Sequence, residues 1–155
     1  MEKHRKGFTV ILLCVLFATV GCIHKTGGSV TPWEQVTTYN AALAQANNTA
    51  ERGAEAVVVS GLVSPSDMRP VIQTTGQVAT LHLQITAILQ QGTATAANVA
   101  SVQTLVDQIK ASIAALPPTT LGIKNPKSQQ SFYADLNSIG TLADSLLASL
   151  KLVVK

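Results

Sequence analysis

The sequence predicts an all-α protein, namely an up-down-up-down antiparallel four-helix bundle that follows an N-terminal signal peptide. Three observations lead to this prediction. Apolar residues recur at spacings of three and four in four separate segments, which is the pattern of amphipathic helices. Glycines, prolines and capping residues separate these segments. No segment shows the sustained apolar–polar alternation of a half-buried strand, so we expect no β-sheet.

The first helix is expected to run from about Pro32 to about Ser60. Thr31 can cap its start, Pro32 can take the first helical position, and Glu34 can reach back to the Thr31 amide, which together make a capping box. Apolar or small residues then repeat every seven positions in two rows, which predicts one continuous buried stripe. The members of that stripe are Val36, Tyr39, Leu43, Ala46, Ala50, Gly53 and Val57.

Three further helices are bounded by the same kinds of signal. We expect these helices to start at Ser64 or Ser66, at Thr93 or Thr95, and at Asn125. Gly61, Gly92 and Pro117 are expected to end the helix that precedes each of these starts. Their stripes are Val71, Thr74, Val78, Leu81, Ile85 and Ile88; Val99, Val102, Val106, Ile109, Ile113 and Leu116; and Phe132, Leu136, Ile139, Ala143, Leu146, Leu150 and Val153. We expect each of the four helices to have about 23–29 residues, or roughly 35–43 Å. Periods near 3.5 and short connections favour antiparallel neighbours at small crossing angles.

The first 22 residues have the organisation of an export signal. Residues 1–7 carry three basic side chains against one acidic one, and Phe8–Val20 is apolar apart from two threonines. This apolar run spans about 20 Å as a helix, whereas a bilayer core requires about 20 such residues. The segment therefore suits the apolar region of a signal peptide better than a spanning helix.

The leader ends in Thr19-Val20-Gly21-Cys22, which resembles the lipobox of bacterial lipoproteins. In that family the cysteine thiol takes a diacylglycerol, the leader is cut directly before it, and the new amino group is usually acylated. The resemblance, which covers residues 1–22 only, implies a lipid-anchored protein of the bacterial cell envelope. It divides the chain into a signal peptide (1–21), a lipidated Cys22 with a flexible tether (22–30) and a bundle (31–155). Thr19 departs from the family, where leucine is commonest. Ordinary cleavage after Gly21 and an uncleaved anchor remain alternatives.

Composition after the leader offers little chemistry. The segment Cys22–Lys155 has eight Lys or Arg and seven Asp or Glu, a difference of +1, and no basic stripe, so we expect no nucleic-acid partner. Cys14 would leave with the leader, so no disulfide is available. We expect no metal, no cofactor and no catalytic set. Glu51 and Glu55 share one helix face but are expected to be solvated, and His82 is expected at the core boundary.

The predicted topology assigns different roles to the two ends of the bundle. The end near the anchor carries Lys25, Trp33, Lys151 and Lys155, where cations would favour an anionic bilayer surface. Trp33 is either an interface anchor or an apolar lid on the bundle. The opposite end holds the loop 117–127, whose candidate contact residues for an envelope protein partner are Leu121, Ile123, Lys124 and Lys127.

The function that fits these features is a non-catalytic envelope module that binds or scaffolds a partner. One alternative is a membrane-active or oligomerising helical protein, which the low charge and the apolar fraction of 46% would suit. A second alternative is an enzyme or a carrier of a small apolar ligand, which a cavity lined by alanine and valine in the bundle would favour.

Overall fold

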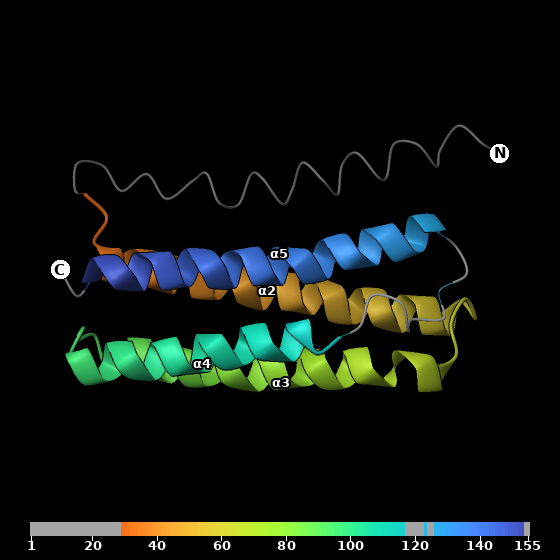
Figure 1. The fold of residues 1–155 in the computed structure, drawn as a ribbon, viewed down its shortest axis with the longest axis horizontal. Helices are drawn as coiled ribbons and strands as arrows, with labels where there is room; N and C mark the ends of the chain where they lie inside the picture. The colour runs from red at the N-terminus through yellow and green to blue at the C-terminus, as the bar shows by residue number, and fades with distance from the viewer. Residues whose placement is uncertain (1–28, 117–122, 124–125, 154–155) are drawn as a thin grey trace. The chain divides into compact units, whose positions relative to one another are not determined.

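The structure is a computed structural model that describes residues 29–116, 123 and 126–153. This part of the chain contains four α-helices and no strand (Figure 1), which confirms the all-α prediction. The helices are α2 (Pro32–Val59), α3 (Pro65–Leu89), α4 (Ala96–Ala114) and α5 (Pro126–Val153). The predicted signal peptide and Cys22 lie outside the described residues.

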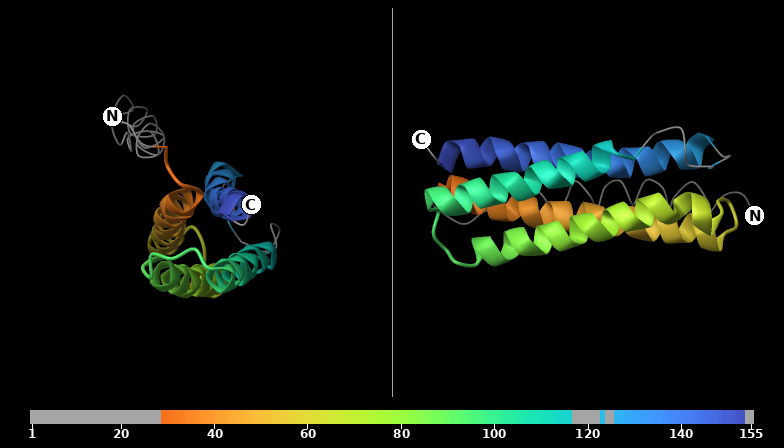
Figure 2. Two further views of the ribbon diagram at one scale, coloured as in Figure 1. Left: turned by 90° about the vertical axis from the view of Figure 1, so that its left-hand side faces the viewer. Right: turned by 60° about the horizontal axis from the view of Figure 1, so that its bottom comes forward.

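The four helices form a bundle within the compact unit Thr31–Lys155. Each helix packs against the next one along the chain, and α5 packs against α2, so the contacts close into a ring. Figure 2 shows the same ring end on, with the four helices around a common centre. Because each helix turns an apolar stripe toward that centre, the core runs along the whole length of the bundle.

The start of α2 is fixed by the predicted capping box. The Glu34 amide donates to Thr31 Oγ1 at 3.2 Å, and the Thr31 amide donates to Glu34 Oε2 at 2.9 Å. Pro32 stands at the first helical position, where its missing N–H leaves no donor unsatisfied. Substituting such a cap by alanine typically costs about 1 kcal/mol.

Side-chain caps also settle two starts that the sequence left open. Ser64, not Ser66, caps α3 by accepting the Asp67 amide at 3.2 Å, and Thr95, not Thr93, caps α4. The turns that precede these helices contain Gly61 at φ 70° and Gly92 at φ 72°. This left-handed conformation is one that glycine adopts at no steric cost, so both turns favour glycine at these positions.

The prediction of four helices of matched length is wrong for α4, which has 19 residues against 28 in α2. At 1.5 Å per residue α4 is about 28 Å long and α2 about 42 Å. The late cap at Thr95 shortens one end of α4. The other end stops at Ala114, shortly before Pro117-Pro118 in the sequence, because residues that precede proline disfavour the helical conformation.

The buried core agrees with the predicted stripes of α4 and α5 at most positions. Val99, Val102, Val106 and Ile109 of α4 are buried, as are the first six members of the α5 stripe. Three predicted members are only partly buried, and these are Ile113, Leu116 and Val153. Each large apolar side chain that is fully buried contributes about 1.5–3 kcal/mol, so these rows supply much of the stability.

The α2 stripe was only half right. Val36, Leu43, Ala46 and Ala50 are buried as predicted, but Tyr39, Gly53 and Val57 are only partly buried. Asn40 and Ala54, each one position after a mispredicted residue, are buried instead, and Asn47 is buried beside Ala46. The buried row of α2 therefore includes two polar side chains, Asn40 and Asn47, that are one heptad apart.

Candidate functional site

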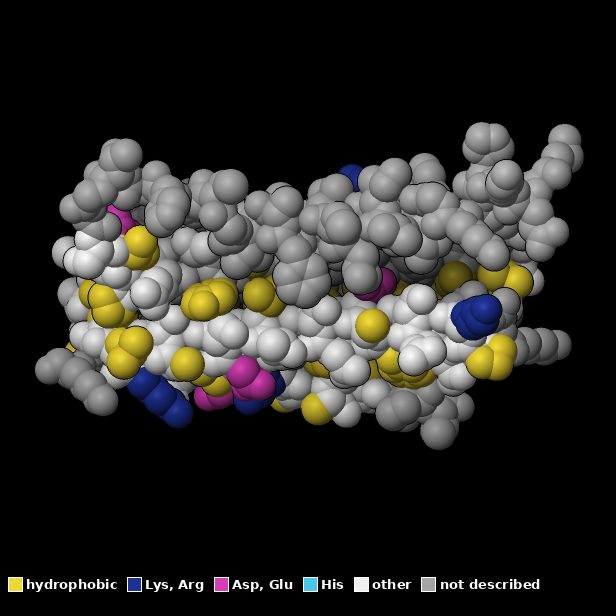
Figure 3. Space-filling model, turned by 90° about the horizontal axis from the view of Figure 1, so that it is seen from above, with side chains coloured by type: hydrophobic (Ala, Val, Ile, Leu, Met, Phe, Trp, Pro, Cys, Tyr) yellow, Lys and Arg dark blue, Asp and Glu magenta, His cyan; other side chains and the backbone are white. Residues whose placement is uncertain are grey.

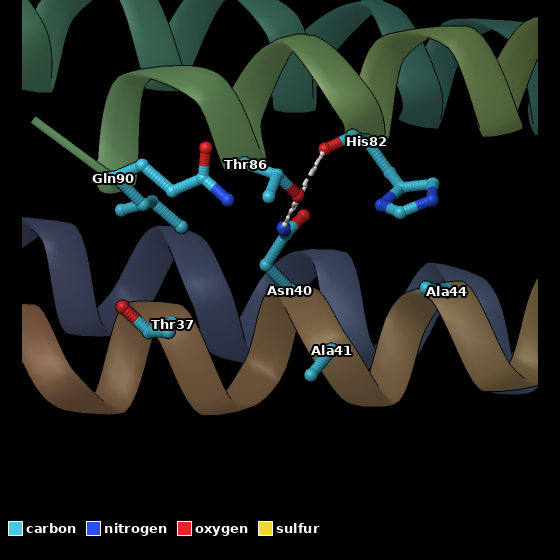
Figure 4. A pocket seen from close by; sticks show the side chains of 8 residues that line it. Thr37, Asn40, Ala41, Ala44, His82, Thr86 and Gln90 are labelled. Carbon is cyan, nitrogen blue, oxygen red and sulfur yellow. Dashed lines mark hydrogen bonds between the residues drawn. The ribbon is translucent and has the colours of Figure 1, made fainter.

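A groove lined by both polar and apolar side chains lies between α2 and α3. Its volume is about 510 Å³. We call it the α2–α3 groove, and its eight lining residues are Thr37, Asn40, Ala41, Ala44, His82, Thr86, Leu89 and Gln90 (Figure 4). None of the eight is Asp, Glu, Lys or Arg, so the groove is uncharged apart from any proton on His82.

Asn40 anchors the polar part of the groove. Its side chain is only 4% exposed, and its Nδ2 donates to Thr86 Oγ1 at 2.8 Å. The Thr86 hydroxyl in turn donates to the His82 carbonyl at 2.9 Å. A longer contact of 3.5 Å joins Asn40 Nδ2 to the same carbonyl. These bonds tie one position on α2 to one turn of α3 (Figure 4).

Two buried polar atoms of the groove have no hydrogen-bond partner among the described residues. They are Asn40 Oδ1 and His82 Nδ1. In Figure 4 the His82 side chain extends from α3 into the space between α3 and α2. A buried polar atom without a partner costs about 1–3 kcal/mol, so each of the two requires an explanation.

His82 is partly buried, as expected for a residue at the core boundary. Desolvation by burial lowers its pKa below the ordinary value of 6.5, and its backbone hydrogen bond opposes this only in part. The imidazole is therefore neutral at neutral pH. One ring nitrogen of a neutral imidazole donates and the other accepts.

A second polar contact lies one heptad further along α2. Asn47 is 2% exposed and its Nδ2 donates to the Thr75 carbonyl of α3 at 3.0 Å. Its Oδ1 is buried without a partner in the described structure. Asn47 does not line the α2–α3 groove, so its role is in packing, where a buried asparagine fixes the register of two helices.

The residues predicted near the anchored end have different environments. Trp33 is partly buried against the core and its Nε1 is buried without a partner among the described residues, which favours the lid over the interface anchor. Lys151 is exposed in the last turn of α5. Lys25 and Lys155 lie outside the described residues.

The structure describes two of the four candidate contact residues in the predicted loop 117–127. Ile123 is only 5% exposed and belongs to the core, so its side chain packs within the bundle and is not available to a partner. Lys127 is exposed in the first turn of α5. Leu121 and Lys124 lie outside the described residues.

A smaller groove between α2 and α5 has one acidic member. It is lined in part by Gly53, Lys127, Phe132 and Asp135, and desolvation by burial raises the pKa of Asp135 above its ordinary value of 3.8. Across the described ranges, no group of three or more His, Cys, Asp and Glu side chains could hold a metal ion. None of the described helices combines the length and the apolarity required to cross a bilayer.

The outer surface is mostly polar and uncharged. On the face drawn in Figure 3 charged side chains are few, acidic and basic ones lie next to each other along one edge, and apolar side chains are scattered over the rest. One ion pair on the bundle surface joins Lys110 of α4 to Asp144 of α5 at 2.5 Å. The Asp144 hydrogen bond, with its charge, raises the pKa of Lys110.

Comparisons with protein-family models, with curated proteins and with solved structures found no significant match to this chain. Its function therefore has to be inferred from its own residues. Sequence reasoning pointed to the leader and to the two ends of the bundle, but it missed the α2–α3 groove. The signal that could have pointed to it is Asn40, a polar residue four positions after Val36 on the apolar row, followed by the small residues Ala41 and Ala44.

Proposed function

We propose that the chain is a lipid-anchored protein of the bacterial cell envelope whose helical bundle acts as a non-catalytic binding or scaffold module. The observation that carries the proposal is Gly21-Cys22 at the end of a basic and then apolar leader. A thiol at that position is the acceptor of the diacylglycerol in the family that the leader resembles. Acyl chains on the first residue then hold the bundle against a membrane.

The short tether limits how far the bundle can stand from the anchor. Eight residues, 23–30, separate Cys22 from the Thr31 cap of α2. A fully extended chain covers at most about 3.6 Å per residue, so the nine steps from Cys22 to Thr31 place the cap of α2 within about 32 Å of the anchored cysteine. The bundle is thus kept close to the lipid surface.

We further propose that the bundle is up-down-up-down and antiparallel. The closed ring of contacts between sequence neighbours supports this arrangement, as do the short α2–α3 and α3–α4 connections (Figure 1). The start of α2, the α3–α4 turn and the end of α5 then face the membrane. Lys151 at the end of α5 would gain about 1 kcal/mol near anionic lipids.

The other end of the bundle is the proposed contact surface for a partner in the envelope. Val59, at the end of α2, is 87% exposed, and Leu62 in the following turn is also exposed. Lys127 lies at the start of α5, at the same end in this topology. Exposed apolar side chains with a nearby cation suit a protein contact, and Val59 and Leu62 replace the buried Ile123 as the apolar contact residues.

Metabolic labelling with a clickable fatty-acid analogue tests the anchor. The native protein should take the label and sediment with membranes, whereas Cys22→Ser should remain unlabelled and retain its leader. Cys14→Ala is the matched control, because Cys14 lies inside the leader and should be dispensable for labelling. Label that persists in Cys22→Ser, or an intact mass that shows an unmodified Cys22, would reject the proposal.

A further inference from the structure

We propose that two copies of this chain pair side by side through the outward face of α2 and α3, with Leu83 of each copy entering the α2–α3 groove of the other. The contact goes beyond the proposed function, because it makes a second copy of the chain a partner of the bundle. Its parallel orientation rests on the proposed lipid anchor, which would hold the same end of both bundles at one membrane. The face itself does not depend on the anchor.

α3 carries a row of side chains that lies away from the core. Among the described helices α3 packs against α2 and α4 only, so its remaining face is turned outward (Figure 2). Positions spaced alternately four and three residues apart follow this face, and all are exposed or partly buried. We call them the outer row, which consists of Ile72, Gly76, Ala79, Leu83, Thr86 and Gln90. This spacing is the one by which one helix packs lengthwise along another.

Two large apolar side chains of the outer row are exposed in the interior of a helix. Ile72 is 40% exposed and Leu83 is 60% exposed. The other large apolar side chains that are exposed in the described structure lie before a helix, in a turn or in the last two residues of a helix, and these are Val30, Val59, Leu62 and Leu152. Leu83 therefore forms a ridge on a rigid element, away from both ends of the bundle.

The α2–α3 groove is a hollow beside this ridge. Thr86 belongs both to the outer row and to the lining of the groove, and His82, next to Leu83 in the chain, also lines it. Ala41 and Ala44 of α2 leave the space open because their side chains are short (Figure 4). Ridge and hollow thus lie at the same level along the bundle. A two-fold pair requires a face that is complementary to itself, and a ridge beside a hollow meets this requirement.

The chemistry of the face favours a second copy as its partner. Residues 35–50 of α2 and the stretch 70–106 contain no Asp, Glu, Lys or Arg, whereas α5 carries four such residues. In a two-fold contact the same patch lies on both sides, so charges in it would approach like charges at a cost. Thr37, Thr86 and Gln90 at the groove each donate and accept hydrogen bonds, so they can pair with identical groups.

A lipid surface is a poorer partner for this face. Anionic lipids are attracted by Lys and Arg, and the stretches 35–50 and 70–106 have neither. A helix that lies in the bilayer interface presents a large apolar face to it, whereas Ile72 and Leu83 are the only large apolar side chains of α3 that are exposed.

The size of the face indicates a weak pair. The outer row is about 27 Å long, and two adjacent helices are about 20 Å wide, so each copy offers about 540 Å². A pair would bury about 1,080 Å², close to the lower limit of about 1,000 Å² for specific interfaces. Such a contact is favoured when two copies are held on one membrane, because the anchors raise their effective concentration.

Thiol cross-linking of the full-length protein in isolated membranes tests the pair. Ala79→Cys places a thiol in the middle of the outer row, and a short bismaleimide should link two copies of this variant into a product with the mass of two chains. Ala100→Cys, at an exposed alanine of α4, is the matched control for random collision and should give at least about fivefold less product. Equal yields from the two variants, no product, or a product with a different protein would reject the proposal.

A second position tests the orientation. Ile72→Cys lies near the start of the outer row and should also link to itself in a parallel pair. In a pair that is antiparallel about the middle of the row, the two copies of position 72 would lie about 27 Å apart, beyond the reach of the linker. A product from Ala79→Cys without one from Ile72→Cys would overturn the parallel orientation.

Two further substitutions in the Ala79→Cys protein test the ridge and the hollow separately. Leu83→Ser removes the ridge and Ala44→Leu fills the hollow, and each should lower the yield about tenfold, since burial of a leucine side chain is worth at least this factor. Neither residue belongs to the buried core, so the melting temperature should hold. Leu152→Ser, at a side chain that is 51% exposed, is the matched control and should keep the yield. An unchanged yield with Leu83→Ser or with Ala44→Leu would reject the contact.

The parent protein separates this contact from the anchor. Its two cysteines are Cys14 in the leader and Cys22 at the lipid site, and neither should react once the leader is removed and Cys22 is acylated. A linked product from the parent protein would show a free Cys22 and would reject the anchor. Mass spectrometry of the linked peptides from Ala79→Cys would still show whether position 79 has reacted, and therefore whether the face pairs.

Discussion

The two halves of the bundle bury different chemistry. In α2 and α3 the buried residues include Asn40, Asn47, Thr74 and Thr75 beside the apolar ones. In the described parts of α4 and α5 the only buried polar residue is Ser149, whose hydroxyl donates to the Ser145 carbonyl of its own helix. The buried polar contacts between helices in the described structure, made by Asn40 and Asn47, thus lie in the first half.

This difference separates two tasks that a bundle must perform. Apolar rows stabilise the fold but tolerate small shifts, because one valine or leucine packs against a neighbour much like another. Each buried asparagine instead donates to one particular position on α3, so a shift by one turn would break both contacts. The first half therefore sets the register of the helices and contains the α2–α3 groove. The second half contributes stability mainly through buried apolar side chains.

The largest expected effect comes from creating a cavity in the apolar half. Ile139→Ala in α5 removes a fully buried side chain and should lower the free energy of unfolding by about 2–5 kcal/mol. Urea denaturation followed by circular dichroism measures the loss. Leu152→Ala, at a side chain that is 51% exposed, should change the free energy by less than about 0.5 kcal/mol. Similar losses in both variants would mean that burial in α5 is not what stabilises this half.

The opposite result is expected for a polar position in the first half. Asn47→Leu removes a buried oxygen without a partner and should raise the free energy of unfolding by about 1 kcal/mol, because the new side chain is apolar and similar in size. It should also broaden or multiply amide signals in NMR spectra, since one register contact is lost. Asn48→Leu, at an exposed neighbour, is the control. A more stable variant with an unchanged, well-resolved spectrum would break the proposed link between Asn47 and register.

The sequence allowed better prediction of the second half than of the first, for a physical reason. An all-apolar stripe such as that of α4 is found by periodicity alone, because burial follows apolarity there. Asparagine side chains usually prefer the surface, but Asn40 and Asn47 are buried. Their hydrogen bonds to α3 offset the cost of burial, and these bonds cannot be read from the sequence because they form only in the folded structure. A search that counts apolar residues therefore selects Tyr39 in place of Asn40 and passes over Asn47.

Local capping chemistry was predictable, but the loops and the groove were not. Thr31 and Glu34 make their hydrogen bonds within one turn, so the sequence contains the whole signal. Ile123 is buried in the core, and no local pattern in the sequence encodes that contact. The α2–α3 groove likewise arises where small residues of one helix face a polar turn of another.

A smaller effect on the free energy of unfolding is expected from a change of pH. It should arise from His82, which lies in the first half of the bundle. The pKa of His82 is lower in the folded protein than its ordinary value of 6.5, so the unfolded chain binds the proton more tightly. The stability contributed by the neutral imidazole is complete above pH 6.5 and is lost as the pH falls through the folded pKa. Urea denaturation at a series of pH values should show this decline, and His82→Gln should reduce it.

The effect of His82 is obtained by subtracting the pH profile of stability of His82→Gln from that of the native protein. This subtraction is needed because Asp135 changes stability with pH in the opposite direction. Burial raises its pKa, so its contribution to stability is present at low pH and is lost as the pH rises through the folded value. The variant leaves Asp135 in place, so the difference between the two profiles reports His82 alone. Identical profiles would show that the imidazole is solvated in the native protein.

The smallest effect is expected at the surface of the second half. Lys110→Ala removes the ion pair with Asp144, which joins α4 to α5 and whose two side chains are 41% and 64% exposed. Water and salt screen such exposed pairs, so the urea midpoint should not change measurably. The charge-swapped double variant, Lys110→Asp with Asp144→Lys, is the control for any change in packing. A midpoint that falls in Lys110→Ala and recovers in the swapped pair would show that the pair stabilises the second half, whose stability would then not come from apolar burial alone.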